Sequence, residues 1–295
     1  MKILITGATG LIGTTLVESL SAEHRLVIIT RDAQKAKNRF GNKPEFIECD
    51  LNSKFLQERD FAGVEAIINL AGESIQGRWT EQKKSKILQS RKNISRNLLA
   101  NCPASVKVII TASAQGIYGD RGDEELTESS AAGQGFLAEV CKAWEADYKK
   151  MTNQRVVILR LGIVLSKRGG ALAKLVGLFS KNLGAVLGSG KQWMSYISLH
   201  DLERVISQAL TDARYEGVIN AVNDAPVTNR EFTVTLCKKM KVFKLPPVPE
   251  FMLKMLMGEM SEIVLSSLKL RPQKLLKLGF NFDDGSLESA LNREL

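Results

Sequence analysis

The sequence predicts an α/β protein: a doubly wound parallel sheet with a small C-terminal α/β region on its substrate side. Three observations lead to this fold class. Short Val-, Ile- and Leu-rich runs alternate with helical patterns through the first half of the chain, a glycine-rich turn follows the first run, and the alternation ends near residue 166. Apolar strands separated by helices are typical of a parallel sheet that is covered on both faces.

The expected elements follow in order along the chain. Six strands are predicted, at residues 2–6, 25–31, 44–51, 64–72, 106–113 and 155–165. Helical periodicity lies between them, most clearly at 11–23 and 80–102. Beyond residue 166 come a glycine-broken helix, a clearer helix at 199–213, a strand at 217–222, and a helix beginning near Thr228. A Met-rich helix at 251–268 is expected to pack in the core, or alternatively to cover a hydrophobic substrate.

Composition excludes several functional classes. The 295 residues include 41 basic and 32 acidic side chains, a net charge of +9, but the basic residues are scattered and form no aromatic-interleaved patch. We therefore expect no nucleic-acid partner. Four unpaired cysteines and two isolated histidines argue against a metal site. The chain starts directly with a strand and has no long apolar run, so we expect a cytoplasmic protein without signal peptide or membrane association.

The stretch ITGATGLIG, residues 5–13, predicts a dinucleotide site. It follows the first strand and opens the first helix, which is the context that such a motif requires. Gly7 permits the tight turn, Gly10 lets the backbone approach a pyrophosphate, and Gly13 allows close packing of helix on strand. The free N–H groups of the helix start attract phosphate. The residues of this loop expected to contact the cofactor are Gly7, Ala8, Thr9, Gly10, Leu11, Ile12 and Gly13.

The end of the second strand favours NADP over NAD. It reads ITRD, which places Thr30 and Arg31 where the adenosine ribose is expected and offers a guanidinium to the 2′-phosphate. The alternative is that Arg31 only begins the next helix and Asp32 caps it. Asp50 and Leu51 should lie beside the adenine, and the cofactor should be lined by Leu70, Ala71 and Gly72.

This cofactor assignment suggests how the chain divides. Residues 1–165 are expected to form the NADP-binding domain, to which helix 199–213 and strand 217–222 return. Residues 166–198 and 223–295 would form the smaller substrate-side domain, in which the glycine- and aromatic-containing segment 188–197 covers a bound substrate.

Several motifs carry a family resemblance. TGATGLIG, the CDL at 49–51 and the NLAG at 69–72 resemble the extended short-chain dehydrogenase/reductases, the NAD-dependent epimerase/dehydratase superfamily with a Rossmann fold. FLAEVCKAWE, LGSGKQWMSYI and RPQKLLKLGFNF resemble its sugar-epimerase-like or cell-division-inhibitor-like branch, which carries a C-terminal domain of unknown function. The resemblance implies NADP(H) binding and a homodimer formed through the helices after strands four and five. It leaves the substrate unknown, and we expect a small polar or sugar-like compound.

The same resemblance exposes a departure at the expected catalytic centre. It implies a Ser or Thr at the end of strand five, for which Ser113 fits and Thr111 is a second candidate. The Tyr expected about 24 residues later falls on Leu137, and the Lys four residues beyond falls on Cys141. The Glu expected next is present as Glu145, which supports the register. The Tyr–Lys pair is therefore missing.

Five further residues near the expected cleft each have two interpretations. Tyr118 is a phenolic proton donor or a packing residue, and Glu73 faces the nicotinamide or bonds its own loop. Lys86 and Arg91, the latter replacing an Asn implied by the resemblance, bind cofactor phosphates or an anionic substrate, or form a solvated face. Arg160 lies near the nicotinamide or forms a buried pair with an acidic residue.

Two functions remain open from the sequence. One is an NADP-dependent oxidoreductase or epimerase-like enzyme that acts on an unidentified small substrate. The other is a catalytically weak NADP-binding regulator, for which the label of the branch implies a link to cell division.

Overall fold

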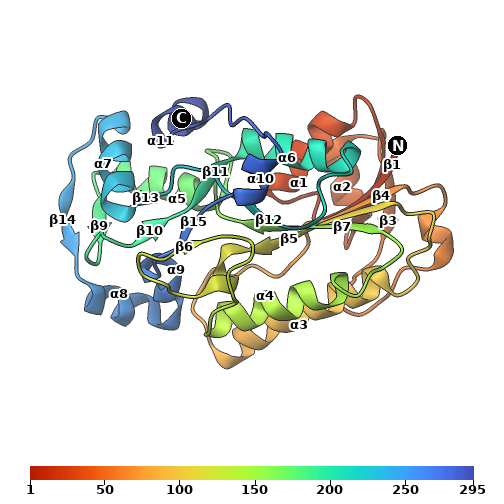
Figure 1. The fold of residues 1–295 in the computed structure, drawn as a ribbon, viewed down its shortest axis with the longest axis horizontal. Helices are drawn as coiled ribbons and strands as arrows, with labels where there is room; N and C mark the ends of the chain where they lie inside the picture. The colour runs from red at the N-terminus through yellow and green to blue at the C-terminus, as the bar shows by residue number, and fades with distance from the viewer.

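A computed structural model describes all residues from 1 to 295 and shows a seven-stranded parallel sheet at its centre (Figure 1). The strand order is β12-β7-β5-β4-β1-β2-β3, so the chain winds outward in both directions from β1 and β4. The strands of this sheet are β1 (Lys2–Thr6), β2 (Arg25–Thr30), β3 (Glu45–Glu48), β4 (Ala66–Asn69), β5 (Val108–Ala114), β7 (Arg155–Leu161) and β12 (Gly217–Ala221). The doubly wound fold predicted from the sequence is confirmed.

Helices cover both faces of the sheet because successive strand residues point to opposite sides. On one side, Ile3 and Ile5 pack with α1 (Leu11–Leu20) and α6 (Leu199–Thr211). On the other, Leu4 packs in a core that includes α3 (Glu81–Leu99) and α4 (Phe136–Tyr148). Figure 1 shows α3 and α4 side by side below the sheet. The connections are completed by α2 (Ala33–Phe40), η1 (Glu58–Phe61) and η2 (Gln115–Tyr118).

Most of the rest of the chain forms short strand pairs and helices at one end of the molecule, on the left in Figure 1, whereas α10 (Gln273–Lys277) packs beside β12 of the sheet. Its strand pairs are β8 (Ile163–Leu165) with β11 (Tyr196–Ser198), β9 (Ala185–Leu187) with β14 (Leu245–Val248), β10 (Trp193–Met194) with β13 (Val227–Thr228), and β6 (Glu125–Leu126) with β15 (Lys269–Leu270). Its helices are α5 (Gly170–Phe179), α7 (Asn229–Met240), α8 (Glu250–Met257), η3 (Gly258–Ser261), α9 (Glu262–Leu265), α10 (Gln273–Lys277) and α11 (Leu287–Glu294). The sheet includes β12 but none of these pairs, and the division into two domains stays a prediction.

The sixth strand differs from the expected continuous run 155–165. It breaks at Gly162 into β7 and β8, and β8 pairs with β11 outside the main sheet. A Cβ atom on Gly162 would lie 2.7 Å from Val222 Cγ1 and 2.8 Å from the Ser195 carbonyl oxygen. The crossing of these backbones requires a glycine, and that crossing ends the strand.

The expectation of one core helix at 251–268 is wrong. The segment is divided into α8, η3 and α9, because Gly258 takes a φ of +58° and ends α8. Phe251, Met255 and Leu256 are each about 70% exposed, and Leu253 is the buried side chain of α8. Apolar composition alone did not show which side of this short helix faces the protein.

No helix in the chain is both long and apolar enough to span a bilayer. The homodimer implied by the resemblance stays a prediction.

Candidate cofactor and substrate sites

The glycine loop has the close packing that a dinucleotide turn needs. Gly7 has a φ of +71°, and a Cβ atom there would lie 2.7 Å from the Leu70 carbonyl. A Cβ atom on Gly13 would lie 2.3 Å from the Gly7 oxygen, so only glycine lets α1 approach β1 this closely. Gly10 begins α1 without a side-chain cap. The first N–H groups of the helix therefore remain available to an anion.

Beside this loop lies a cavity of about 260 Å³. It is lined by eleven of the predicted cofactor residues and by Glu73: Gly7, Ala8, Thr9, Gly10, Thr30, Arg31, Asp50, Leu51, Leu70, Ala71 and Gly72. These residues come from the ends of β1, β2, β3 and β4, which meet at the carboxyl edge of the sheet. Leu11, Ile12, Gly13, Thr111, Lys86, Arg91 and Arg160 do not line it. The structure thus brings together four sequence segments that were predicted separately.

The residues that follow β2 have different roles: Asp32 caps a helix, whereas Arg31 lines the cavity. The Asp32 side chain accepts a hydrogen bond from the Lys35 N–H at 2.8 Å and so caps α2. Arg31 is exposed, lines the cavity, and has no acidic partner within ion-pair distance. Arg39 was missed by the sequence reasoning; its Nη1 donates to the Thr9 carbonyl oxygen at 3.1 Å and brings a second guanidinium to the loop.

Glu73 stands at the mouth of the cavity in an ion pair. Its carboxylate lies 2.6 Å from Lys83 Nζ. The hydrogen bond from Lys83 holds the pKa of Glu73 below its usual range, so this side chain stays ionised near neutral pH. Lys86 lies on α3, like Lys83, and is exposed to solvent. This agrees with the interpretation of Lys86 as part of a solvated helix face.

Arg91 is the buried cation next to this cavity. Only 7% of the residue is exposed, its guanidinium packs against Gly72, and it lies 5.1 Å from the centroid of the Trp144 ring. One nitrogen, Nη1, donates to the carbonyl oxygens of Glu73 and Ile87, whereas Nε is buried without a partner. Burial lowers the pKa of Arg91. An unpaired donor at this position suits a ligand that reaches past Gly72.

Ser113 and Tyr118 belong to one buried hydrogen-bond network. Ser113 Oγ donates to Glu145 at 2.8 Å, and Arg160 forms two hydrogen bonds of 2.9 and 3.0 Å with the Glu145 carboxylate. Arg160 also donates to the Tyr118 hydroxyl, which donates to Asn220 Oδ1 at 2.7 Å. The structure favours the buried pair for Arg160 and the packing role for Tyr118, because the phenol is fully buried and its proton is committed.

The two α4 positions at which the resemblance places Tyr and Lys hold groups without acid–base capacity. Leu137 packs against Gly116. Burial raises the pKa of the Cys141 thiol to about 12, so the thiol stays protonated at neutral pH.

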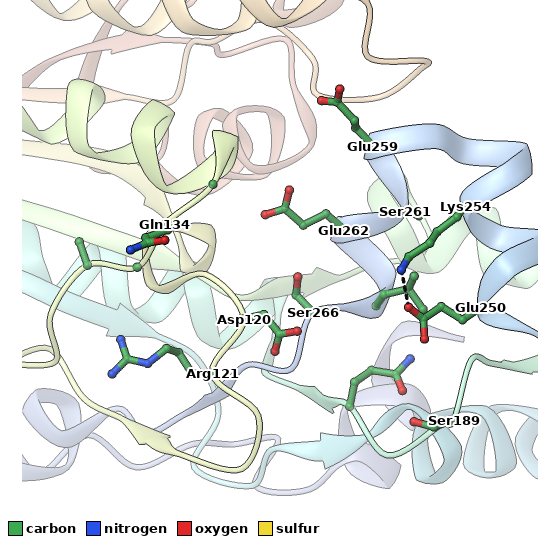
Figure 2. Close-up of a pocket in the computed structure, with 15 residues that line it drawn as sticks. Asp120, Arg121, Gln134, Ser189, Glu250, Lys254, Glu259, Ser261, Glu262 and Ser266 are labelled. Atoms are coloured by element: carbon green, nitrogen blue, oxygen red, sulfur yellow. Dashed lines mark ion pairs between the residues drawn. The ribbon is translucent and has the colours of Figure 1, made fainter.

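A second cavity, of about 840 Å³, lies between the start of α4 and the segment η3–α9 (Figure 2). It is lined by Asp120, Arg121, Ala132, Gly133, Gln134, Gly135, Ser189, Gln192, Glu250, Lys254, Glu259, Ser261, Glu262, Leu265 and Ser266. Only Ala132 and Leu265 contribute apolar side chains. Ser189 and Gln192 belong to the segment expected to cover a substrate. Glu259 and Glu262 were missed, since nothing local in the sequence marks which part of the chain they face.

One further cluster was not expected from the sequence. His200, Asp201 and Asp283 have side-chain oxygen and nitrogen atoms within 4.8 Å of one another. Asp201 accepts hydrogen bonds from the N–H groups of Asp283 and Asp284, and Arg204 pairs with both Asp201 and Asp283. These contacts neutralise the carboxylates and fasten the C-terminal segment to α6. Ser198 caps α6 by accepting a hydrogen bond from the Asp201 N–H.

Fold and site together define a Rossmann-type protein with a nucleotide loop at the carboxyl edge of its sheet and a separate polar cavity between α4 and the segment η3–α9. The chain belongs to the NAD dependent epimerase/dehydratase family, whose profile matches residues 3–222. Residues 248–294 match a domain of unknown function, DUF1731. The superfamily and the C-terminal domain of unknown function that the sequence motifs suggested are thereby confirmed.

Similar proteins span nearly the whole chain. The chain is 37% identical over 298 residues to a chloroplastic epimerase family protein of Arabidopsis thaliana, a homolog of SDR39U1, covering 99% of this chain and 86% of that protein. It is 32% identical to the epimerase family protein YfhF of Bacillus subtilis, covering 99% and 97%. The structure of human SDR39U1 with NADPH is similar with a TM-score of 0.87 and 27% identity, covering 100% and 99% of the two chains.

Proposed function

We propose that this protein is an NADP(H)-dependent, epimerase-like oxidoreductase that acts on a small polar, sugar-like substrate. One observation carries the cofactor assignment: Arg31 lines the glycine-loop cavity with a guanidinium that has no acidic side chain within ion-pair distance. A guanidinium of this kind can bind the 2′-phosphate of NADP through two parallel hydrogen bonds. The NADPH bound to human SDR39U1 supports the same assignment.

The residues present fit this cofactor. The open N–H groups at the start of α1 would hold the pyrophosphate, and Thr30 and Arg31 the 2′-phosphate. Asp50 and Leu51 would contact the adenine end, and Leu70 to Gly72 would line the path toward the nicotinamide. When bound, NADPH supplies a hydride to a carbonyl carbon. Glu73 remains a proposed catalytic residue. Ser113 is buried and donates its proton to Glu145, so we propose it as a positioning residue that acts through Glu145 and Arg160. Tyr118 is no longer proposed, because it is buried and its proton is donated to Asn220.

Arg91 is proposed to supply the positive charge that a helix lysine would otherwise bring to the cofactor. Arg91 does not itself line the glycine-loop cavity, but its guanidinium packs against Gly72, which does, and its Nε has no partner in the protein; these two observations support the proposal. A buried donor without a partner costs about 1–3 kcal/mol, which a ribose hydroxyl would recover. Lys86 and Arg160 are not needed in this arrangement.

We expect Arg91→Met to weaken NADPH binding about tenfold, the effect of one charged hydrogen bond. The long side chain preserves the contact with Trp144, so the fold should survive. Isothermal titration of NADPH gives the affinity, and Lys86→Met on the same helix is the control, since Lys86 is exposed and away from the cavity. Equal affinities for the two variants would remove Arg91 from the cofactor site.

The proposed activity is tested by a metabolite screen that follows NADPH absorbance. We expect at least one small hydroxylated or carbonyl compound to be turned over, and we expect that turnover to fall in Ser113→Ala. A protein that binds NADPH tightly but consumes it with no compound would instead support the regulator alternative. Absence of NADPH binding would contradict the proposal at its first step.

A further inference from the structure

We propose that the cavity of about 840 Å³ binds a hydroxylated small molecule that is uncharged or carries an amine, and that it rejects nucleoside diphosphates. This inference rests on the proposed function: we assign the small substrate of that activity to this cavity, and the inference narrows the class of that substrate. The volume lies within the range of roughly 300–1,000 Å³ that is usual for ligand pockets.

The position of the cavity suits a substrate of the cofactor site. Asp120 and Arg121 follow η2, which itself follows β5, and Gly133 to Gly135 lead into α4. This wall therefore belongs to the carboxyl edge of the sheet, where ligands of doubly wound folds bind. The opposite wall comes from α8, η3 and α9, as Figure 2 shows for Glu250, Lys254, Glu259 and Glu262.

The cations of the cavity are already neutralised. Arg121 forms two hydrogen bonds, of 2.6 and 2.7 Å, with Glu124, and a third with the Ala131 carbonyl oxygen. Lys254 lies 2.7 Å from Glu250 on α8. A diphosphate is bound in proteins by unpaired guanidinium and ammonium groups, and this cavity offers none. A nucleoside diphosphate would have to break one of these ion pairs.

The unsatisfied groups of the cavity are hydrogen-bond acceptors. Gln192 is buried, with only 7% of the residue exposed. Its Nε2 donates to the carbonyl oxygens of Leu187 and Val264, both at 3.0 Å. Those two bonds fix the amide and leave Oε1 without a protein partner. Glu262 has no hydrogen-bond or ion-pair partner, and burial together with the charges of Glu259 and Asp120 raises its pKa. Acceptors of this kind are matched by hydroxyl and ammonium donors.

The start of α4 does not convert the cavity into an anion site. This helix has no side-chain cap, so its first N–H groups would attract a phosphate. The Glu262 carboxylate oxygen, however, lies only 3.2 Å from the place of a Cβ atom on Gly135, at that same helix start. An incoming phosphate would meet this carboxylate, and Asp120 adds a second negative charge. The helix start thus favours the chain's own carboxylate over an external anion.

The test uses amide spectra of the full-length protein and three probes: glucosamine, N-acetylglucosamine and UDP-glucose. We expect glucosamine to shift the amide signals of Gly133, Gly135 and Ser266 in a saturable way, N-acetylglucosamine to shift them more weakly, and UDP-glucose to leave them unchanged. Glu262→Gln should weaken glucosamine binding about fivefold, the upper range for a solvent-accessible charged pair. Glu139→Gln, on the exposed side of α4, is the matched control and should bind like the parent protein.

Two outcomes would overturn this inference. Either UDP-glucose shifts the same amides at lower concentration than glucosamine, or neither amino sugar nor N-acetylated sugar shifts them at all. Thermal stabilisation by NADPH is measured in parallel on the same samples. Stabilisation by NADPH with no response in the cavity rejects the substrate class alone, whereas a response in the cavity without stabilisation by NADPH rejects the proposed function alone.

Discussion

Glu145→Gln is expected to lower the free energy of unfolding by about 3–5 kcal/mol, as when one partner of a buried ion pair is removed. Glu145 and Arg160 are almost fully buried, and the guanidinium makes two hydrogen bonds to the carboxylate. The substitution removes the negative charge and leaves the guanidinium uncompensated in the core. The Ser113 hydroxyl would then donate its hydrogen bond to a neutral amide instead of a carboxylate.

Equilibrium unfolding in urea measures this loss. Glu139→Gln on the exposed side of the same helix is the control and should change stability by less than about 0.5 kcal/mol. If the two variants unfold at the same urea concentration, the network around Ser113 contributes no stability, and its assignment as a structural unit is wrong.

The pH dependence of this pair follows from the direction of its shift. Burial alone would raise the pKa of Glu145, but hydrogen bonds from Arg160 and Lys149 outweigh it and hold the pKa below its usual range. A carboxylate with a lowered pKa contributes stability that is present above its unfolded-state pKa and is lost as pH falls through its folded-state pKa. The difference between the parent protein and Glu145→Gln should therefore shrink in acid.

Arg31→Asp is expected to reverse the preference between NADPH and NADH. Charge-assisted hydrogen bonds contribute about 1.5–3 kcal/mol, so losing them should weaken NADPH binding roughly 10- to 150-fold. The new carboxylate would repel the 2′-phosphate but accept a hydrogen bond from the ribose hydroxyl of NADH. Isothermal titration with both nucleotides measures the ratio of the two affinities.

Lys37→Asp makes the same change of charge on the exposed face of α2, outside the cavity. This control should lower both affinities only slightly and keep NADPH preferred. An unchanged preference in Arg31→Asp would sink the assignment of Arg31, and Arg39 beside Thr9 would then be the next residue to substitute.

The central sheet could be predicted because its signals are local. Most of its strands contain a short run of buried aliphatic residues, with β3 as the exception, and Gly7 and Gly13 of the loop stand at positions where backbone atoms leave no room for a Cβ. The break at Gly162 and the exposure of Phe251 and Met255 were not predictable in this way. Both depend on a partner segment distant in the chain, which periodicity does not reveal.

The sequence by itself determined the fold class, the nucleotide loop, and the absence of a tyrosine–lysine pair at the expected positions of α4. Tertiary structure alone decided what the polar residues do. It paired Arg160 with Glu145, turned Arg91 toward Gly72, committed the Tyr118 proton to Asn220, and set Gln192 and Glu262 around one cavity. The reason is physical: backbone propensity and hydrophobic periodicity act over a few residues, whereas a charge or a hydrogen bond takes its role from whichever distant group lies within about 3 Å.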